Sequence, residues 1–94
     1  MIRVAVRSTG ITMDGHAGCG RHGIDIVCAA VSALTCGLIH ALQSLTDNRI
    51  RADTDSGQAR ICWEKLDDSG RLLVDSWFLA ITDINMDYQC IEYV

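Results

Sequence analysis

The chain has 94 residues, of which 49% are hydrophobic, and a formal net charge of −4 at pH 7. This length fits a single domain over residues 1–94 with a thin core, and the acidic balance argues against nucleic acid as a partner. Five cysteines without a CxxC spacing, and a first segment patterned as a strand and not as a signal peptide, favour a cytoplasmic protein with reduced thiols.

The first two predicted elements form a β-hairpin. Apolar or small residues alternate with polar ones over residues 2–7 and again over residues 11–17, which is the period of strands with one buried face. Ser8-Thr9-Gly10 supplies the turn between them. His16 falls on the polar face of the second strand. It therefore reaches the helix that follows only if the strand ends or bulges near Gly15.

A long apolar helix is predicted from Ile24 to about Leu45. Its apolar residues surround the helix almost completely, so we expect one face to cover the sheet and the other to pack on a second copy of the chain. The segment approaches the length of a membrane span. It contains several polar residues, however, and has no basic cluster on either flank, so we expect a buried helix and no membrane partner.

The second half of the chain repeats the strand–strand–helix order. Strands are predicted over residues 49–53 and 58–66, with the turn Thr54-Asp55-Ser56-Gly57 between them. Asp67-Asp68-Ser69-Gly70 supplies capping residues for a helix over residues 72–85, and residues 88–94 can add a short strand. The order ββαββα predicts an α+β two-layer sandwich, with the helices on one face of a largely antiparallel sheet.

The chemistry of this chain concentrates between the first hairpin and the long helix. His16 is a candidate general base and Cys28 a candidate nucleophile, on either side of a loop that holds Gly18, Gly20 and Gly23. Asp25 is a favourable N-cap residue, which would place Cys28 third in the helix, where the helix dipole favours a thiolate. We hypothesise that the glycine loop closes on substrate and so completes the site.

Two further residues have alternative roles. Asp25 either caps the helix or orients His16, as the third member of a catalytic triad does. Ser32 lies one helical turn after Cys28, where it either bonds the thiol or the loop, or returns a hydrogen bond to the carbonyl of Cys28. His22, inside the loop, is the rival of His16 for the role of base. The other cysteines (Cys36, Cys62 and Cys90) are interpreted as structural positions.

The string GHAGCGRHGIDIVCAAVSAL resembles the Prp family, the ribosomal-processing cysteine proteases. The family pattern is Gly-His-Ala, a short glycine-containing loop and Asp-Ile-Val-Cys-Ala-Ala-Val-Ser. The resemblance matches His16 to the catalytic histidine, Cys28 to the nucleophile and His22 to a variable loop position, and it makes Asp25 and Ser32 supporting residues. Cys19 departs from the pattern, because members often carry an aromatic residue there.

The resemblance also implies a function and an assembly. It implies a cysteine endopeptidase without a cofactor, which removes the N-terminal extension of large-subunit ribosomal protein twenty-seven. Members of the family cut after paired aromatics and before a small residue, and they form homodimers through their helices. An apolar pocket beside Cys28 is expected to hold the aromatics. A phage-borne relative with a different protein target is the alternative within the same chemistry.

Two alternatives lie outside protease chemistry. His16, Cys19, His22 and Cys28 have the residue types and short spacings of zinc ligands, although the resemblance makes Cys19 a departure and favours a site without metal. A non-enzymatic interaction module, which binds a partner through the apolar helix, is the other alternative. Metal analysis and the behaviour of Cys28→Ala separate these readings.

Overall fold

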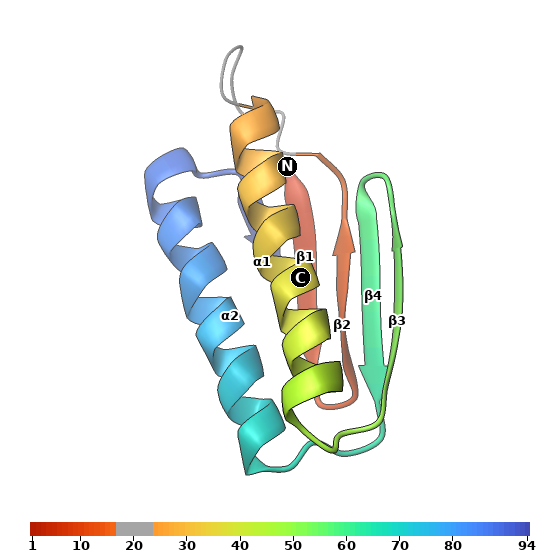
Figure 1. Cartoon of the computed structure of the whole chain (residues 1–94). Helices are drawn as coiled ribbons and strands as arrows, with labels where there is room; N and C mark the ends of the chain where they lie inside the picture. The colour runs from red at the N-terminus through yellow and green to blue at the C-terminus, as the bar shows by residue number, and fades with distance from the viewer. Residues whose placement is uncertain (17–23) are drawn as a thin grey trace.

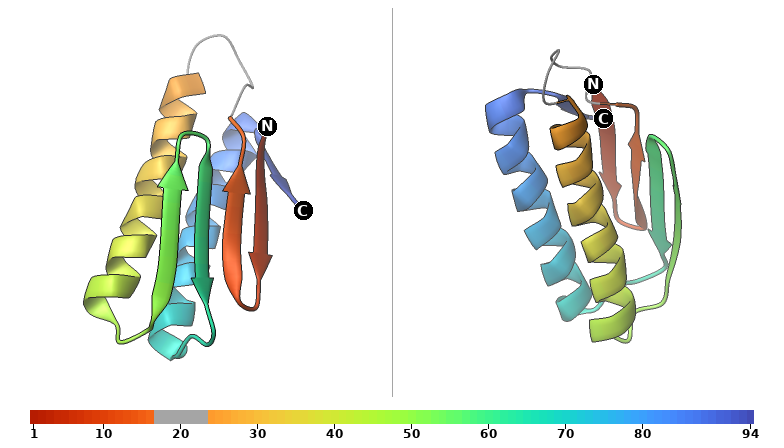
Figure 2. Two further views of the ribbon diagram at one scale, coloured as in Figure 1. Left: turned by 90° about the vertical axis from the view of Figure 1, so that its right-hand side faces the viewer. Right: turned by 45° about the horizontal axis from the view of Figure 1, so that its top comes forward.

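The computed structural model describes residues 1–16 and 24–94, except for the side chains of residues 24 and 25. The elements, in chain order, are β1 (Ile2–Arg7), β2 (Gly10–Asp14), α1 (Ile24–Leu45), β3 (Ile50–Asp55), β4 (Gln58–Trp63), α2 (Asp68–Tyr88) and β5 (Ile91–Tyr93). Both helices lie on one face of the sheet, and the other face is open (Figures 1 and 2). This confirms the predicted α+β sandwich and the final strand.

The sheet has the strand order β3-β4-β2-β1-β5. The β1–β2, β2–β4 and β3–β4 pairs are antiparallel, so the two hairpins join through their second strands. The last strand, β5, pairs in parallel with β1, with Ile91 opposite Ile2. The ring of Tyr93 packs on Phe78 of α2 with centroids 5.1 Å apart, and its hydroxyl is 2.7 Å from that of Thr82. Side chains of α2 therefore hold β5 at this edge.

The core lies between the sheet and the helices. Alternate residues of the strands point inward, so Val4, Ile11 and Ile61 are almost fully buried against apolar residues of both helices. One polar group crosses this layer: the indole Nε1 of Trp77 donates to the Thr35 hydroxyl at 3.1 Å, and that hydroxyl is 2.8 Å from the carbonyl of Val31. A buried indole N–H needs such a partner, and α1 provides it for α2.

The structure moves several predicted boundaries. The second strand ends at Asp14 and not at residue 17, since Gly15 has a φ of +106° that the extended strand does not allow. The strand after the long helix runs to Asp55, two residues beyond its predicted end, and β4 stops at Trp63. The second helix starts four residues earlier than predicted and ends three residues later.

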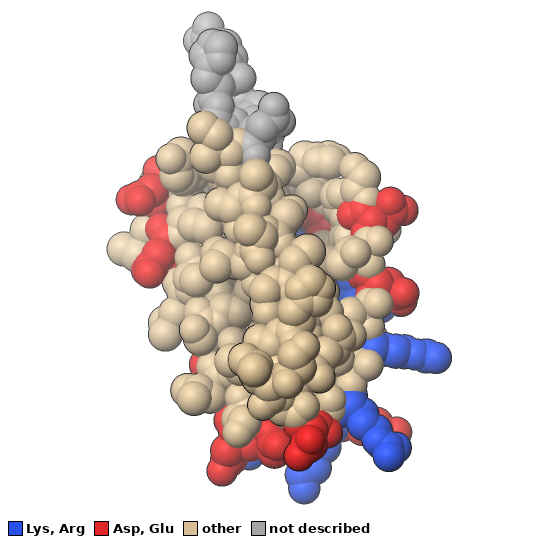
Figure 3. All heavy atoms as spheres, in the orientation of Figure 1, with Lys and Arg blue, Asp and Glu red and all other residues tan. Residues whose placement is uncertain are grey.

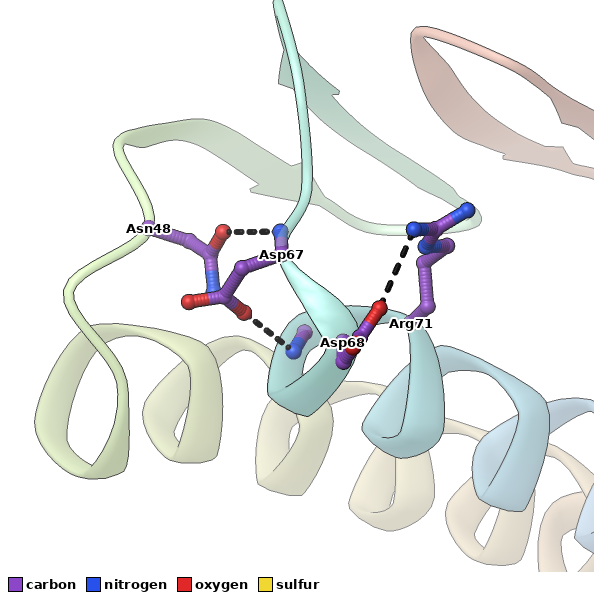
Figure 4. A network of polar contacts seen from close by, with 5 residues as sticks. Asn48, Asp67, Asp68 and Arg71 are labelled. Carbon is purple, nitrogen blue, oxygen red and sulfur yellow. Dashed lines mark hydrogen bonds and ion pairs between the residues drawn. The ribbon is translucent and has the colours of Figure 1, made fainter.

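The early start of α2 has a local cause, drawn in Figure 4. Asp67 is the N-cap, and its carboxylate accepts a hydrogen bond from the Gly70 N–H at 2.8 Å. Asn48 fixes the cap, because its amide group donates to the carboxylate of Asp67 and accepts from the Asp67 N–H, at 2.8 and 2.9 Å. These hydrogen bonds, from Asn48 first and from Gly70 second, hold the pKa of the Asp67 carboxyl below its usual range.

The segment from Ile26 to Leu45 has a mean hydropathy of 1.8, and by length and composition alone it is able to cross a membrane. In this fold its residues Val27, Val31, Leu38 and Leu42 belong to the core. Only 33% of the segment is buried within the chain, so it is a core helix along one face and exposed on the other.

Candidate functional site

The site begins where β2 ends. Gly15 adopts a φ of +106°, and a Cβ on this residue would lie 2.6 Å from the carbonyl oxygen of Met1, so only glycine fits here without rearrangement. Its N–H donates to the carbonyl of Gly57 at 2.8 Å, one step beyond the last β2–β4 pair. The chain then leaves the sheet, as the approach of His16 to the helix requires.

The imidazole of His16 lies against the turn between β3 and β4. A Cβ at Gly57 would stand 2.9 Å from Nε2 and 3.0 Å from Cε1 of the ring, so the side chain rests on the bare α-carbon of that glycine. The carbonyl oxygen of His16 accepts a hydrogen bond from the nitrogen of Met1 at 2.7 Å. The ring itself remains exposed, which suits a group that must meet substrate.

Cys28 enters the site from α1, where its side chain is half-buried. The helix begins at Ile24, so Asp25 is the second helical residue and not the N-cap, and Cys28 is the fifth residue and not the third. The prediction that Asp25 is the N-cap was therefore wrong. A carboxylate in the first turn still suits the helix dipole, but the field of the dipole is weaker at Cys28 than we expected.

A cavity of about 120 Å³ brings these parts together. It lies between α1, the end of β2 and the β3–β4 turn, and both His16 and Cys28 line it. Ser32 is also part of the lining, as its predicted supporting role requires. The walls are mixed in character: the apolar residues are Ile2, Met13, Val31 and Ala59, and the carboxyl-bearing ones are Asp14 and Asp55.

The cavity also includes residues that the sequence did not indicate. Gly57 belongs to the β3–β4 turn and Gln58 is the first residue of β4. The sequence predicted a turn at Gly57, but it did not indicate that this turn would lie beside His16. Cys36 was interpreted as structural, but it is exposed and lines the cavity, since it stands about two turns after Cys28 on α1. By contrast, Cys90 is fully buried, as predicted.

Part of the predicted site lies outside the described residues. This holds for Gly18, Gly20 and Gly23, with their proposed closure, for the rival base His22, and for the side chain of Asp25. It also holds for Cys19, a member of the alternative zinc set. Among the residues that the structure does describe, no three His, Cys, Asp or Glu side chains gather in a group suited to a metal ion.

The comparisons with known proteins decide the family. The family model for cysteine protease Prp matches residues 1–92. The ribosomal processing cysteine protease Prp of Staphylococcus aureus is 34% identical over 83 residues, which cover 85% of this chain and 78% of that protein. The chain belongs to the Prp family. It is therefore a cysteine protease of the ribosomal-processing class, as the motif between Gly15 and Ser32 suggested.

Solved Prp structures share the fold over nearly the whole chain. The Staphylococcus aureus Prp in complex with a substrate peptide has a TM-score of 0.83 at 28% identity, covering 99% of this chain and 95% of the other. A Streptococcus mutans protein has a TM-score of 0.79 at 29% identity, with coverages of 98% and 92%. The Staphylococcus aureus Prp has also been solved with a covalently linked product peptide.

Proposed function

We propose that this Prp protein cuts its substrate with Cys28 as nucleophile and His16 as general base. The observation that carries the proposal is the one cavity that both side chains line, although Cys28 lies twelve positions after His16 in the sequence. The Cys28 thiolate adds to the scissile carbonyl, and the imidazolium of His16 gives its proton to the leaving amine. His16 then takes a proton from the water that hydrolyses the thioester, and returns this proton to the Cys28 sulfur as it leaves, which regenerates the thiol.

We further propose that the substrate is the N-terminal extension of large-subunit ribosomal protein twenty-seven. Membership of the ribosomal-processing family supports this target. The substrate peptide that the Staphylococcus aureus relative holds supports the broader point that a peptide segment is cut. The apolar part of the cavity, Met13, Val31 and Ala59, is a suitable wall for the aromatic side chains that precede the cut.

The test uses a peptide that spans the junction of this extension, incubated with the full chain and followed by mass spectrometry. One cut after paired aromatics, lost in Cys28→Ala and strongly slowed in His16→Ala, is the expected result. A peptide with the aromatics replaced by alanine serves as the matched control. Cleavage that persists in Cys28→Ala would refute the role of this thiol, and an intact peptide with wild type would refute the substrate.

A homodimer through α1 is the assembly we propose. The exposed face of this helix carries small residues at a spacing of four, Ala29, Ala33 and Gly37, between the exposed Ile26 and Leu45. Figure 3 shows this face as a column without acidic or basic side chains, which gather at its sides and lower end. Small residues let two helices approach closely, so a second copy suits this surface.

Sedimentation at micromolar concentration tests the dimer. Wild type is expected at twice the chain mass, and Ala33→Arg at one chain mass, because two such charges would meet across the interface. Ser76→Arg, on the exposed side of α2, is the matched control and should remain dimeric. A monomeric wild type would contradict the proposal.

We also propose a cytoplasmic location, on the grounds of the cysteine pattern, which cell fractionation checks.

A further inference from the structure

The contact between His16 and the β3–β4 turn is the least expected feature of this site. Gly57 has a φ of +74°, and its α-carbon faces the Nε2 corner of the imidazole, where an added Cβ would be 2.9 Å from Nε2. Real Cβ atoms essentially never approach another heavy atom this closely, so the ring occupies space that any other residue at position 57 would fill. The glycine is therefore part of the surface on which the imidazole rests.

The backbone at both ends of this contact is fixed. The Gly15 N–H donates to the carbonyl of Gly57 at 2.8 Å, so the residue before His16 is tied to the residue beneath its ring. The β2–β4 pair Asp14–Gln58 precedes this bond and sets its register. Because an exposed ring has room to rotate away, extra bulk at Gly57 would displace the imidazole and leave the sheet in place.

We propose that Gly57 is a positioning residue for His16: its missing side chain lets the imidazole lie against the β3–β4 turn, beside the cavity that Cys28 lines. The inference rests on the proposed role of His16 as base. A methyl group at position 57 moves the ring off the turn, and a shift of about 1 Å in a catalytic group is enough to slow a reaction by roughly a hundredfold.

The experiment compares Gly57→Ala and Gly57→Asn with wild type. Asparagine tolerates a positive φ better than alanine does, but it adds the same Cβ. Two readouts are used: the NMR resonance of the His16 Cε1 proton, and the rate at which iodoacetamide alkylates Cys28, resolved by mass spectrometry. Both variants should shift the His16 resonance and slow alkylation by about tenfold or more. Ser56→Ala, in the same turn, should change neither.

The same substitution made in the His16→Ala variant separates this inference from the proposed function. In His16→Ala, adding Gly57→Ala should leave the alkylation rate unchanged, because no ring remains to be displaced. An unmoved His16 resonance, or equal slowing with and without His16, would overturn the inference. If Gly57→Asn were much milder than Gly57→Ala, backbone strain would be the cause, and the inference would also fail. Equal alkylation of wild type and His16→Ala would instead refute the proposed base, without any Gly57 variant.

Discussion

Both ends of the sandwich place a glycine under a polar side chain, with opposite results. At one end, a Cβ on Gly70 would stand 2.7 Å from the amide nitrogen of Asn48, and at the other, a Cβ on Gly57 would stand 2.9 Å from the imidazole of His16. The Asn48 side chain is held by two hydrogen bonds to Asp67. Within the described residues, no hydrogen bond reaches the imidazole nitrogens of His16.

This difference separates a structural contact from a chemical one. At the Asn48 end, the side-chain amide both donates to Asp67 and accepts from it, and these two hydrogen bonds fix the start of α2. At the His16 end, the ring packs against Gly57 and its nitrogens accept and donate no hydrogen bond among the described residues, as the proposed role of a base requires. We therefore expect variants at the His16 end to change cleavage more than stability, and variants at the Asn48 end to do the reverse.

The largest effect is expected for Cys28→Ala. Cleavage of the extension peptide should fall by roughly 10⁴-fold or more, since no other group replaces the nucleophile. The melting temperature should stay close to that of wild type, because the thiol is only half-buried. Single-turnover cleavage and thermal unfolding on the same preparation measure both. A large drop in Tm would show that this end of the molecule is structural after all.

Gly15→Ala should be an exception to this division, because we expect it to lower both stability and cleavage. Alanine at this position would have to adopt a φ of +106°, and its Cβ would lie 2.6 Å from the carbonyl oxygen of Met1. Both constraints involve backbone atoms, which cannot rotate away as a side chain can. We expect the free energy of unfolding to fall by about 3 kcal/mol and cleavage to weaken as His16 moves. Urea unfolding measures the first effect. A stability equal to that of wild type would mean that this backbone conformation is not needed.

Thr35→Val tests the region between the two ends. The substitution leaves the buried Nε1–H of Trp77 without its acceptor, and we expect a loss of about 2 kcal/mol in the free energy of unfolding. The double variant Thr35→Val with Trp77→Phe removes both polar partners. Its loss of stability should therefore be smaller than the sum of the losses of the two single variants. If the double variant is no better than the sum of the two single changes, the hydrogen bond is not the source of the effect.

Asp67→Ala should lower stability at the Asn48 end by a smaller amount, because the cap is exposed, and leave cleavage unchanged. The pKa of this carboxyl is lowered in the folded state, first by Asn48 and then by Gly70. A lowered pKa means that its contribution is complete above the ordinary value of 3.8 and disappears as the pH falls through the folded value. The Tm difference between wild type and Asp67→Ala should therefore be larger at pH 7 than at pH 3.

The smallest effect is a gain in stability from Gly37→Ala. An added Cβ meets no atom within 4 Å, and alanine is the better helix former in the middle of α1. The free energy of unfolding should rise by about 0.5–1 kcal/mol, measured by urea unfolding. A loss of stability that appears only at dimer-forming concentrations would place this position inside the proposed interface.

Much of the fold was readable from local patterns. Alternation predicted the hairpins, and the apolar periods predicted both helices, because burial on one face determines these patterns. The parallel pairing of β5 with β1 was not predicted, since the position of a three-residue strand depends on where α2 ends and on its contacts with Phe78 and Thr82.

The site divides in the same way. His16, Cys28 and Ser32 come from one short motif, so the sequence indicated them. Gly57 became part of the site only through the pairing of β2 with β4, which joins segments more than forty residues apart, and no local pattern reports such a register. Asp25 was predicted to be the cap but lies inside α1, because helix starts are among the least certain boundaries in a sequence.

The pairing of the first strand with the last has a consequence during synthesis. Ile2 and Val4 find their neighbours on β5 only after residue 93 has been added, because Ile91 and Tyr93 are their partners. Until then, one edge of β1 stays open, and an open apolar edge is where chains pair with each other wrongly. A nascent chain stalled before residue 91 should therefore be a better substrate for chaperones than the finished protein.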